Sequence, residues 1–394
     1  MASIALTAIA ELVTCDPAIG RGELGIVDDG VLVADEGTVV YAGPRRGAPS
    51  GVEMQVELHG HCVVPGFVDS HTHLVFAGDR AGEFTRRMAG QPYQPGGILE
   101  TVAATRAAGR PALEAHAGRL AREAMSYGTT TLEVKTGYGL TPRHEAILLD
   151  VARGVTSEAT FLGAHIVPAE YEHDRAGYIA LLTEVMLPAA EGVARWCDVF
   201  CEAGAFDVDE SRAVLQAARD RGLGLRVHAN QLSAGGGVAL ACEMGAASAD
   251  HCTHLTPGDV SALADSDTVA TILPISDFCT RQPYADGRRL IDASATVALA
   301  SNCNPGSSYS VSVPLAMALA VRECGLSAGE ALWAATAGGA RALRRSDVGR
   351  LAPGCRADAL VIAAPSHEHL VYRMGSNLVS AVLKDGKWAR GHLS

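Results

Sequence analysis

The chain has 394 residues, of which 48% are hydrophobic, and a formal net charge of −12. This length and hydrophobic content can bury a large core, whereas scattered negative charge argues against nucleic acid and anionic membranes as partners. The 10 cysteines contain no Cys-x-x-Cys pair, which is typical of reduced, buried thiols. The N-terminus lacks a basic region and no apolar run is long enough to span a bilayer, so we predict a cytoplasmic protein.

Both ends of the chain have the pattern of short antiparallel strands. Residues 1–62 alternate apolar and polar positions between Asp-Gly and Glu-Gly turns, and residues 348–394 do the same. We therefore predict one small β-sandwich domain to which both termini contribute.

Residues 63–347 instead alternate strand-like and helix-like segments. Eight apolar runs, among them TTTLEVKTG, LGLRVHAN and ATVALASN, alternate with helical segments that often begin with a capping residue and end with Gly. Eight such units make a (β/α)8 TIM barrel, and near-continuous apolar strands suit a parallel sheet buried on both faces. A doubly wound open sheet is the alternative, but the first strand is not followed by a GxGxxG motif.

Histidines stand at the ends of several predicted barrel strands, where active sites of this fold lie. His71 and His73, at the end of the first strand, are two residues apart and should point the same way. The third, fifth and sixth strands end in His165, His228 and His251. A single strand histidine is more often structural, but histidines at four strand ends favour one shared metal site.

Imidazole groups with a carboxylate are the ligands of a zinc or iron centre that activates water and polarises a carbonyl. The pattern thus indicates hydrolysis of an amide-like or amidine-like bond. The eighth strand, however, ends in Asn302, where such a centre would use a carboxylate.

Several motifs together resemble the imidazolonepropionase family of the amidohydrolase superfamily: HTHLVFAGDR, EVKTGYGL, GAHIVPAEY, HANQ, ADHCTHL and NPGSS. The resemblance covers nearly the whole chain. It implies a metal-dependent hydrolase barrel and a cyclic amidohydrolase of histidine degradation. That enzyme adds water to 4-imidazolone-5-propanoate and gives N-formimidoyl-L-glutamate. Its substrate is a small molecule with a carboxylate, and homodimers are common in the superfamily.

The resemblance also implies residue roles. The positions that correspond to metal ligands are His71, His73, His228 and Asn302. Those that correspond to catalytic residues are His251, Asn302 and Gln231. Those that correspond to substrate-binding residues are Arg80, Tyr93, Tyr138, His165, Asn304, Gly306 and Ser307, with Arg80 on the carboxylate. The fourth strand, CDVFCEAG, has no lysine that could bridge two metals, so we expect one divalent ion, zinc or iron.

Two positions depart from the family pattern. Gln231 stands where many members have a carboxylate, although Gln also occurs. Asn302 stands where the pattern has Asp, and an amide is a weaker ligand and no base at physiological pH. Three interpretations remain open: an enzyme whose base has been replaced, a paralogue with another metal-assisted reaction such as a cyclising condensation, and a non-catalytic small-molecule binder.

Overall fold

The computed structural model describes residues 3–91 and 97–391. The chain forms two compact units. One contains Met1–Asp69, Glu123–Thr131 and Ser312–Ser394, and the other contains Ser70–Arg122 and Leu132–Val311. The domain boundaries expected at residues 62/63 and 347/348 stay predictions.

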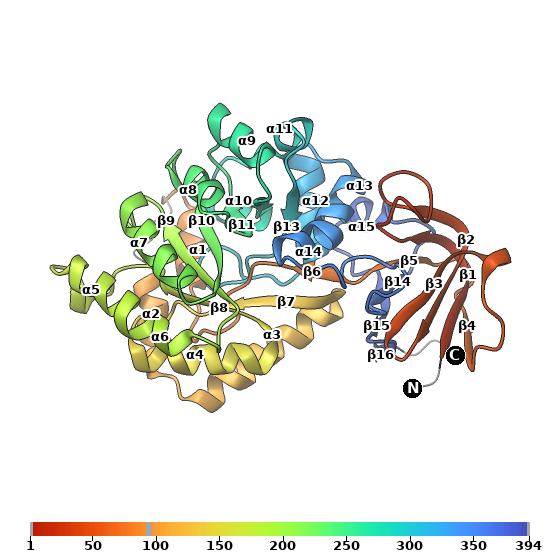
Figure 1. Cartoon of the computed structure of the whole chain (residues 1–394), viewed down its shortest axis with the longest axis horizontal. Coiled ribbons are helices and arrows are strands. Elements are labelled where there is room, and N and C mark those ends of the chain that lie inside the picture. The colour runs from red at the N-terminus through yellow and green to blue at the C-terminus, as the bar shows by residue number, and fades with distance from the viewer. Residues whose placement is uncertain (1–2, 92–96, 392–394) are drawn as a thin grey trace. The chain divides into compact units, whose positions relative to one another are not determined.

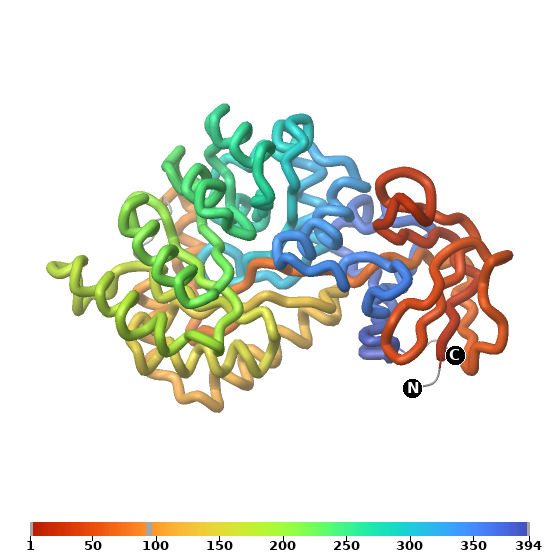
Figure 2. Tube along the Cα trace, in the orientation of Figure 1, coloured from red at the N-terminus to blue at the C-terminus, as the bar shows by residue number. Residues whose placement is uncertain are grey.

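The unit that holds both termini contains a sheet of eight strands. Seven follow the order β16 (Lys387–Arg390), β15 (Val379–Lys384), β14 (Ala359–Ile362), β5 (Cys62–Pro65), β1 (Ile4–Val13), β2 (Ile26–Asp35) and β3 (Thr38–Pro44), and β4 (Met54–Glu57) pairs with β1. Figure 2 shows the red N-terminal and blue C-terminal segments side by side, where β5 pairs antiparallel with β14 and Val63 opposes Val361. The predicted β-domain built from both ends is confirmed.

A second eight-stranded sheet runs in chain order. Its strands are β6 (Phe67–Asp69), β7 (Thr129–Lys135), β8 (Glu158–Ala164), β9 (Trp196–Cys201), β10 (Gly224–Ala229), β11 (Ser248–His251), β12 (Val269–Ile272) and β13 (Val297–Leu299). The pairs from β7 to β13 are parallel, and most of their residues are buried, as two covered faces require. The predicted (β/α)8 barrel is confirmed.

Helices follow the barrel strands, except for the last helix, which lies between β14 and β15. The helices are α1 (Ala81–Met88), α2 (Ile98–Ala107), α3 (Arg110–Ser126), α4 (Pro142–Val155), α5 (Arg175–Leu181), α6 (Leu187–Ala190), α7 (Val208–Arg219), α8 (Gly237–Glu243), α9 (Pro257–Ala264), α10 (Pro274–Thr280), α11 (Gly287–Asp292), α12 (Val313–Glu323), α13 (Ala328–Trp333), α14 (Gly339–Ala342) and α15 (His369–Tyr372). Of these helices, α4 packs on β8, α7 on β9 and α8 on β10 (Figure 1). Within the residues described, no helix is both long and apolar enough to cross a membrane.

The first barrel strand is shorter than its sequence pattern predicts. It ends at Asp69, so His71 and His73 follow the strand. Backbone hydrogen bonds nevertheless tie this segment to the end of the barrel: Asn302 N donates to His71 O (3.0 Å) and His73 N donates to Cys303 O (2.9 Å). These bonds join the segments after β6 and β13, and they place the predicted ligands beside Asn302.

Candidate metal and substrate site

Three histidines bring their Nε2 atoms together at the carboxyl end of the barrel. His73 Nε2 lies 3.3 Å from His71 Nε2 and 3.2 Å from His228 Nε2, and all three rings are buried. Tetrahedral ligands at about 2.0–2.1 Å from a zinc ion lie about 3.4 Å apart. The spacing of His73 Nε2 from each of the other two nitrogen atoms is therefore that of two ligands on one ion.

The opposite nitrogen atoms of two of these rings face carboxylates. His71 Nδ1 lies 2.7 Å from Asp250 Oδ2, and His228 Nδ1 lies 3.0 Å from Asp198 Oδ2. A proton on Nδ1 in each ring leaves a lone pair on Nε2, and carboxylates commonly orient metal-binding histidines in this way. The tautomers of His71 and His228 thus suit a divalent ion, because each ring keeps the lone pair of its Nε2 atom for the metal.

A buried lysine lies beneath the histidines. Lys135 Nζ is 2.8 Å from Asp198, 2.9 Å from Glu133 and 3.7 Å from Asp250, and Arg226 also contacts Asp250. Burial alone would raise the pKa of Asp250, but Arg226 and then His71 hold it well below its ordinary value. Burial would likewise raise the pKa of Asp198, and His228 and Lys135 lower it instead. Both carboxylates are therefore ionised and can accept hydrogen bonds from the histidines.

Four of these histidine rings, those of His71, His73, His165 and His251, have lowered pKa values and are neutral at physiological pH. Burial, followed by the charge of Lys135, lowers the pKa of His71 well below its ordinary value. Burial and the neighbouring rings do the same for His73 and His251, and lower the pKa of His165 to about 3. Neutral imidazole is the form that binds a metal ion.

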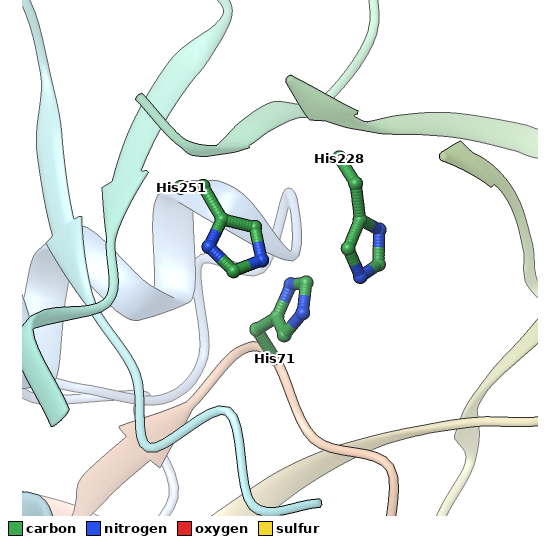
Figure 3. Close-up of side chains that lie close together, drawn as sticks. All are labelled: His71, His228 and His251. Atoms are coloured by element: carbon green, nitrogen blue, oxygen red, sulfur yellow. The ribbon is translucent and has the colours of Figure 1, made fainter. Parts of the chain in front are cut away.

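His251 stands beside the same centre. Figure 3 shows the rings of His71, His228 and His251 facing one another, and one nitrogen atom of each lies within 4.8 Å of the others. His73 Nε2 lies 3.2–3.3 Å from the Nε2 atoms of His71 and His228, so His73 and His251 both adjoin this pair of rings.

A second group of acidic and histidine side chains also lies close together, namely His71, Asp198 and Asp250. Lys135 Nζ lies within 3.7 Å of both carboxylates, so an ammonium already balances their charge. This group is better described as support for the histidines than as another metal site.

Four of the histidines, His73, His165, His228 and His251, open onto a cavity. The residues that line it are His73, Arg80, Ile98, Tyr138, His165, Phe200, His228, Gln231, His251, Asn302, Asn304 and Ser307. The structure thus brings together almost all the site residues named from the sequence. Gly306 lies next to Arg80 instead of on the cavity wall, and Tyr93 falls outside the described residues.

Asn302 is placed by its backbone. Its N–H binds His71 O, and its carbonyl accepts a hydrogen bond from Asn304 Nδ2 (2.7 Å). Its φ of 52° lies in the left-handed region, which Asn and Asp adopt more readily than other residues with a side chain. The backbone at this position therefore suits Asp as well as Asn.

Sequence reasoning missed the buried charges that support the site. The strand pattern does not predict that Lys135 and Arg226 pair with Asp198, Asp250 and Glu133. The available signal was a charged residue inside an apolar strand, as in CDVFC and LRVHA, because such residues are rarely buried without a partner.

Glu202, at the end of β9, supports the loop that carries Gln231. Its Oε2 accepts a hydrogen bond from Leu232 N (2.8 Å), and its Oε1 accepts one from Ser233 Oγ. Its carboxylate is thus engaged with the loop after β10 and not with the histidines.

Comparison with known proteins agrees with this geometry. The family model described as "Amidohydrolase family" matches residues 62–389. The chain is 56% identical to an imidazolonepropionase of Streptomyces griseus, over 98% of this chain and 99% of that protein. It is 57% identical to one of Salinispora tropica, over 98% of each.

Solved structures with low sequence identity share the fold. An atrazine chlorohydrolase of Arthrobacter aurescens, crystallised with zinc, has a TM-score of 0.72 at 17% identity and covers 98% of this chain and 95% of its own. A zinc-bound adenosine deaminase of Xanthomonas campestris has a TM-score of 0.73 at 16% identity, over 99% of this chain and 93% of its own.

Proposed function

The chain belongs to the imidazolonepropionase family of the amidohydrolases, and from that premise we propose that it hydrolyses 4-imidazolone-5-propanoate to N-formimidoyl-L-glutamate in histidine degradation. Water adds to a ring carbon, the ring C–N bond breaks, and the leaving nitrogen takes up a proton. One observation carries the proposal: His73 Nε2 lies 3.2–3.3 Å from the Nε2 atoms of His71 and His228, and His73 and His228 line a cavity with a buried arginine that can bind a carboxylate.

The residues that would hold one divalent ion, zinc or iron, are His71, His73 and His228, with Asn302 beside them. When bound, such an ion lowers the pKa of a water molecule and polarises a carbonyl. The two nitrogen–nitrogen distances of 3.2 and 3.3 Å are compatible with a zinc ion, and imidazole ligands also suit iron.

The other cavity residues then bind and orient the substrate. Arg80 pairs with the propanoate carboxylate, and Tyr138 and His165 contact the imidazolone and its tail. The carboxamide of Gln231 offers a hydrogen bond to a ring nitrogen but cannot take its proton. The loop that grips the other end of the substrate contains Asn304, Gly306 and Ser307.

Proton transfer falls to His251 in this proposal. Its ring adjoins the proposed ligands, with centroids 5.5 Å from His228 and 5.8 Å from His71. From there it can orient the attacking water and pass protons. Asn302 supplies no anionic base, so we propose that the native chain hydrolyses the ring more slowly than a carboxylate at this position would allow.

Metal analysis joined to a product assay tests the proposal. Protein purified without chelator should carry about one divalent ion per chain, and ring opening should yield N-formimidoyl-L-glutamate. His228→Ala should lose both the stoichiometric ion and the product. His173→Ala, at an exposed loop position, is the matched control and should keep both. Unchanged metal content in His228→Ala would refute the ligand assignment.

A further inference from the structure

Arg80, the residue before α1, belongs to a chain of three charged side chains that runs along this helix. Glu83 Oε2 lies 2.6 Å from Arg80 Nε, and Glu83 Oε1 lies 2.7 Å from Arg87 Nη2. The spacings of three and four residues place these side chains on one face of the helix. Both guanidinium groups are buried, and the cluster keeps one net positive charge.

Arg87 connects this helix to two other segments. Its Nη1 donates to Cys279 O (2.8 Å) in α10, and its Nη2 donates to Gly306 O (3.0 Å) in the loop that follows β13. Arg87 does not line the cavity. Arg87 can therefore act on a ligand indirectly, through Glu83 and through the loop at Gly306.

The Arg80 guanidinium also lies in a slot between two glycines. A Cβ atom on Gly306 would lie 2.1 Å from Arg80 Nη1, and one on Gly97 would lie 2.1 Å from Arg80 Nη2. Any side chain at either position would displace Arg80. The glycines and Glu83 thus restrict the orientation of this long side chain.

We propose that Glu83 and Arg87 are positioning residues that orient Arg80 for a substrate carboxylate and couple it to the loop at Gly306. The inference rests on the proposed function, in which Arg80 binds the propanoate group. A flexible arginine would lose rotamer freedom when a ligand binds, whereas an arginine already fixed by Glu83 and the glycine slot does not. Glu83 also cancels one of two buried positive charges, so the remaining charge matches a single carboxylate.

The test compares two ligands that differ only in charge: imidazole-4-propanoate and its methyl ester, measured on the metal-loaded protein. Glu83→Gln and Arg87→Met should each weaken binding of the acid about tenfold and leave binding of the ester within about twofold, because the lost contact serves the carboxylate. Arg87→Lys, which keeps the charge, should restore part of the affinity. Arg86→Met changes an exposed neighbour in the same helix and should have no effect.

Metal content and ester binding report folding independently of the carboxylate. If Glu83→Gln and Arg87→Lys each lose as much affinity for the ester as for the acid, the positioning role is overturned. This comparison holds even if Arg87→Met does not fold. If Arg80→Ala weakens binding of the acid but not of the ester, and neither Glu83→Gln nor Arg87→Met does so, this inference is overturned. The carboxylate contact of Arg80 in the proposed function would then still stand. No acid-selective loss in Arg80→Ala would instead overturn the carboxylate contact in the proposed function.

Discussion

Asn302 shows how backbone and side-chain roles separate at a single residue. Its N–H and carbonyl are both bound, to His71 and Asn304, and its left-handed φ suits Asp equally well. The side chain faces the cavity that contains the histidines. A change from amide to carboxylate should therefore alter the chemistry of the site and leave the fold intact.

Asn302→Asp should raise hydrolysis of 4-imidazolone-5-propanoate by about 10² or more, the range of a restored general base. It should also tighten metal binding, because an anionic oxygen replaces a neutral one. Steady-state kinetics and metal competition on both proteins measure the two effects. If the variant gains no hydrolysis while the native chain turns over a related carboxylate, the chain is a paralogue with other chemistry. Turnover by neither form, with ligand binding by both, would identify a binder.

The sequence predicted the histidines of this site but not their partners. His71 and His73 could be read from their spacing and their place after a strand. Their supports could not, because His71 binds Asp250, 179 residues away, and the match depends on how strands β6, β7 and β11 come together in the barrel. Arg80 was predicted from the family motif, whereas Glu83 became visible only through its contacts.

At the scale of elements, one carboxylate shapes the loop that carries Tyr138. Glu145 in α4 accepts hydrogen bonds from the backbone N–H groups of Gly137 (3.1 Å), Gly139 (2.7 Å) and Leu140 (2.8 Å). His165 Nδ1 contacts the carbonyl of Gly137 at 2.9 Å. The loop and two predicted substrate-binding residues thus depend on a buried side chain of the following helix.

Glu145→Gln should loosen this loop, because the amide NH2 replaces an acceptor oxygen and leaves at least one buried N–H unpaired. We expect a loss of about 1–3 kcal/mol in the free energy of unfolding and weaker binding of imidazole-4-propanoate. Urea denaturation and ligand titration measure these effects. Asp150→Asn is the control, since Asp150 is exposed in the same helix and its ion pair with Arg110 is worth little. Equal destabilisation by the two substitutions would contradict the role of Glu145.

Element boundaries were less predictable than element types. The run TTTLEVKTG predicts a strand, which forms as β7, and Tyr138 follows this strand and lines the cavity. The conformation of its loop was not predictable, because it is imposed by Glu145 from the next helix. The sequence predicts a longer strand before His71 than the one that forms. The segment after Asp69 is held by backbone hydrogen bonds to Asn302 and Cys303, and its sequence pattern does not differ from that of a strand.

The fold of the whole molecule was the most predictable feature. Eight repeats of strand and helix determine a barrel because each apolar strand must be covered on both faces. The terminal strands alternate apolar and polar residues instead, and β1 places Leu6 and Leu12 in a core with Leu383 from the other end of the chain. The sequence pattern therefore distinguishes the two sheets even though one of them is discontinuous along the chain.

Stability of the whole chain should depend on pH through a carboxyl group outside the catalytic cavity. Asp277 in α10 is buried; its Oδ1 accepts a hydrogen bond from Thr253 Oγ1 (3.0 Å), and its Oδ2 has no partner among the described residues. Burial raises the pKa of Asp277 from 3.8 to about 7, although the Thr253 hydrogen bond opposes the shift. The folded state thus holds this proton more tightly than the unfolded state, and the stability it contributes is lost as pH rises from about 4 to about 7.

Asp277→Asn should remove this loss, because a neutral amide of similar size can still accept the Thr253 hydrogen bond. The variant should be more stable than the native chain at pH 8, by up to about 4 kcal/mol for three pKa units, and the difference should shrink toward pH 4. Urea midpoints across this range measure it. Asp265→Asn, at an exposed position, is the control and should follow the native curve. A native-like pH dependence in Asp277→Asn would show that its carboxyl group ionises normally in the folded chain.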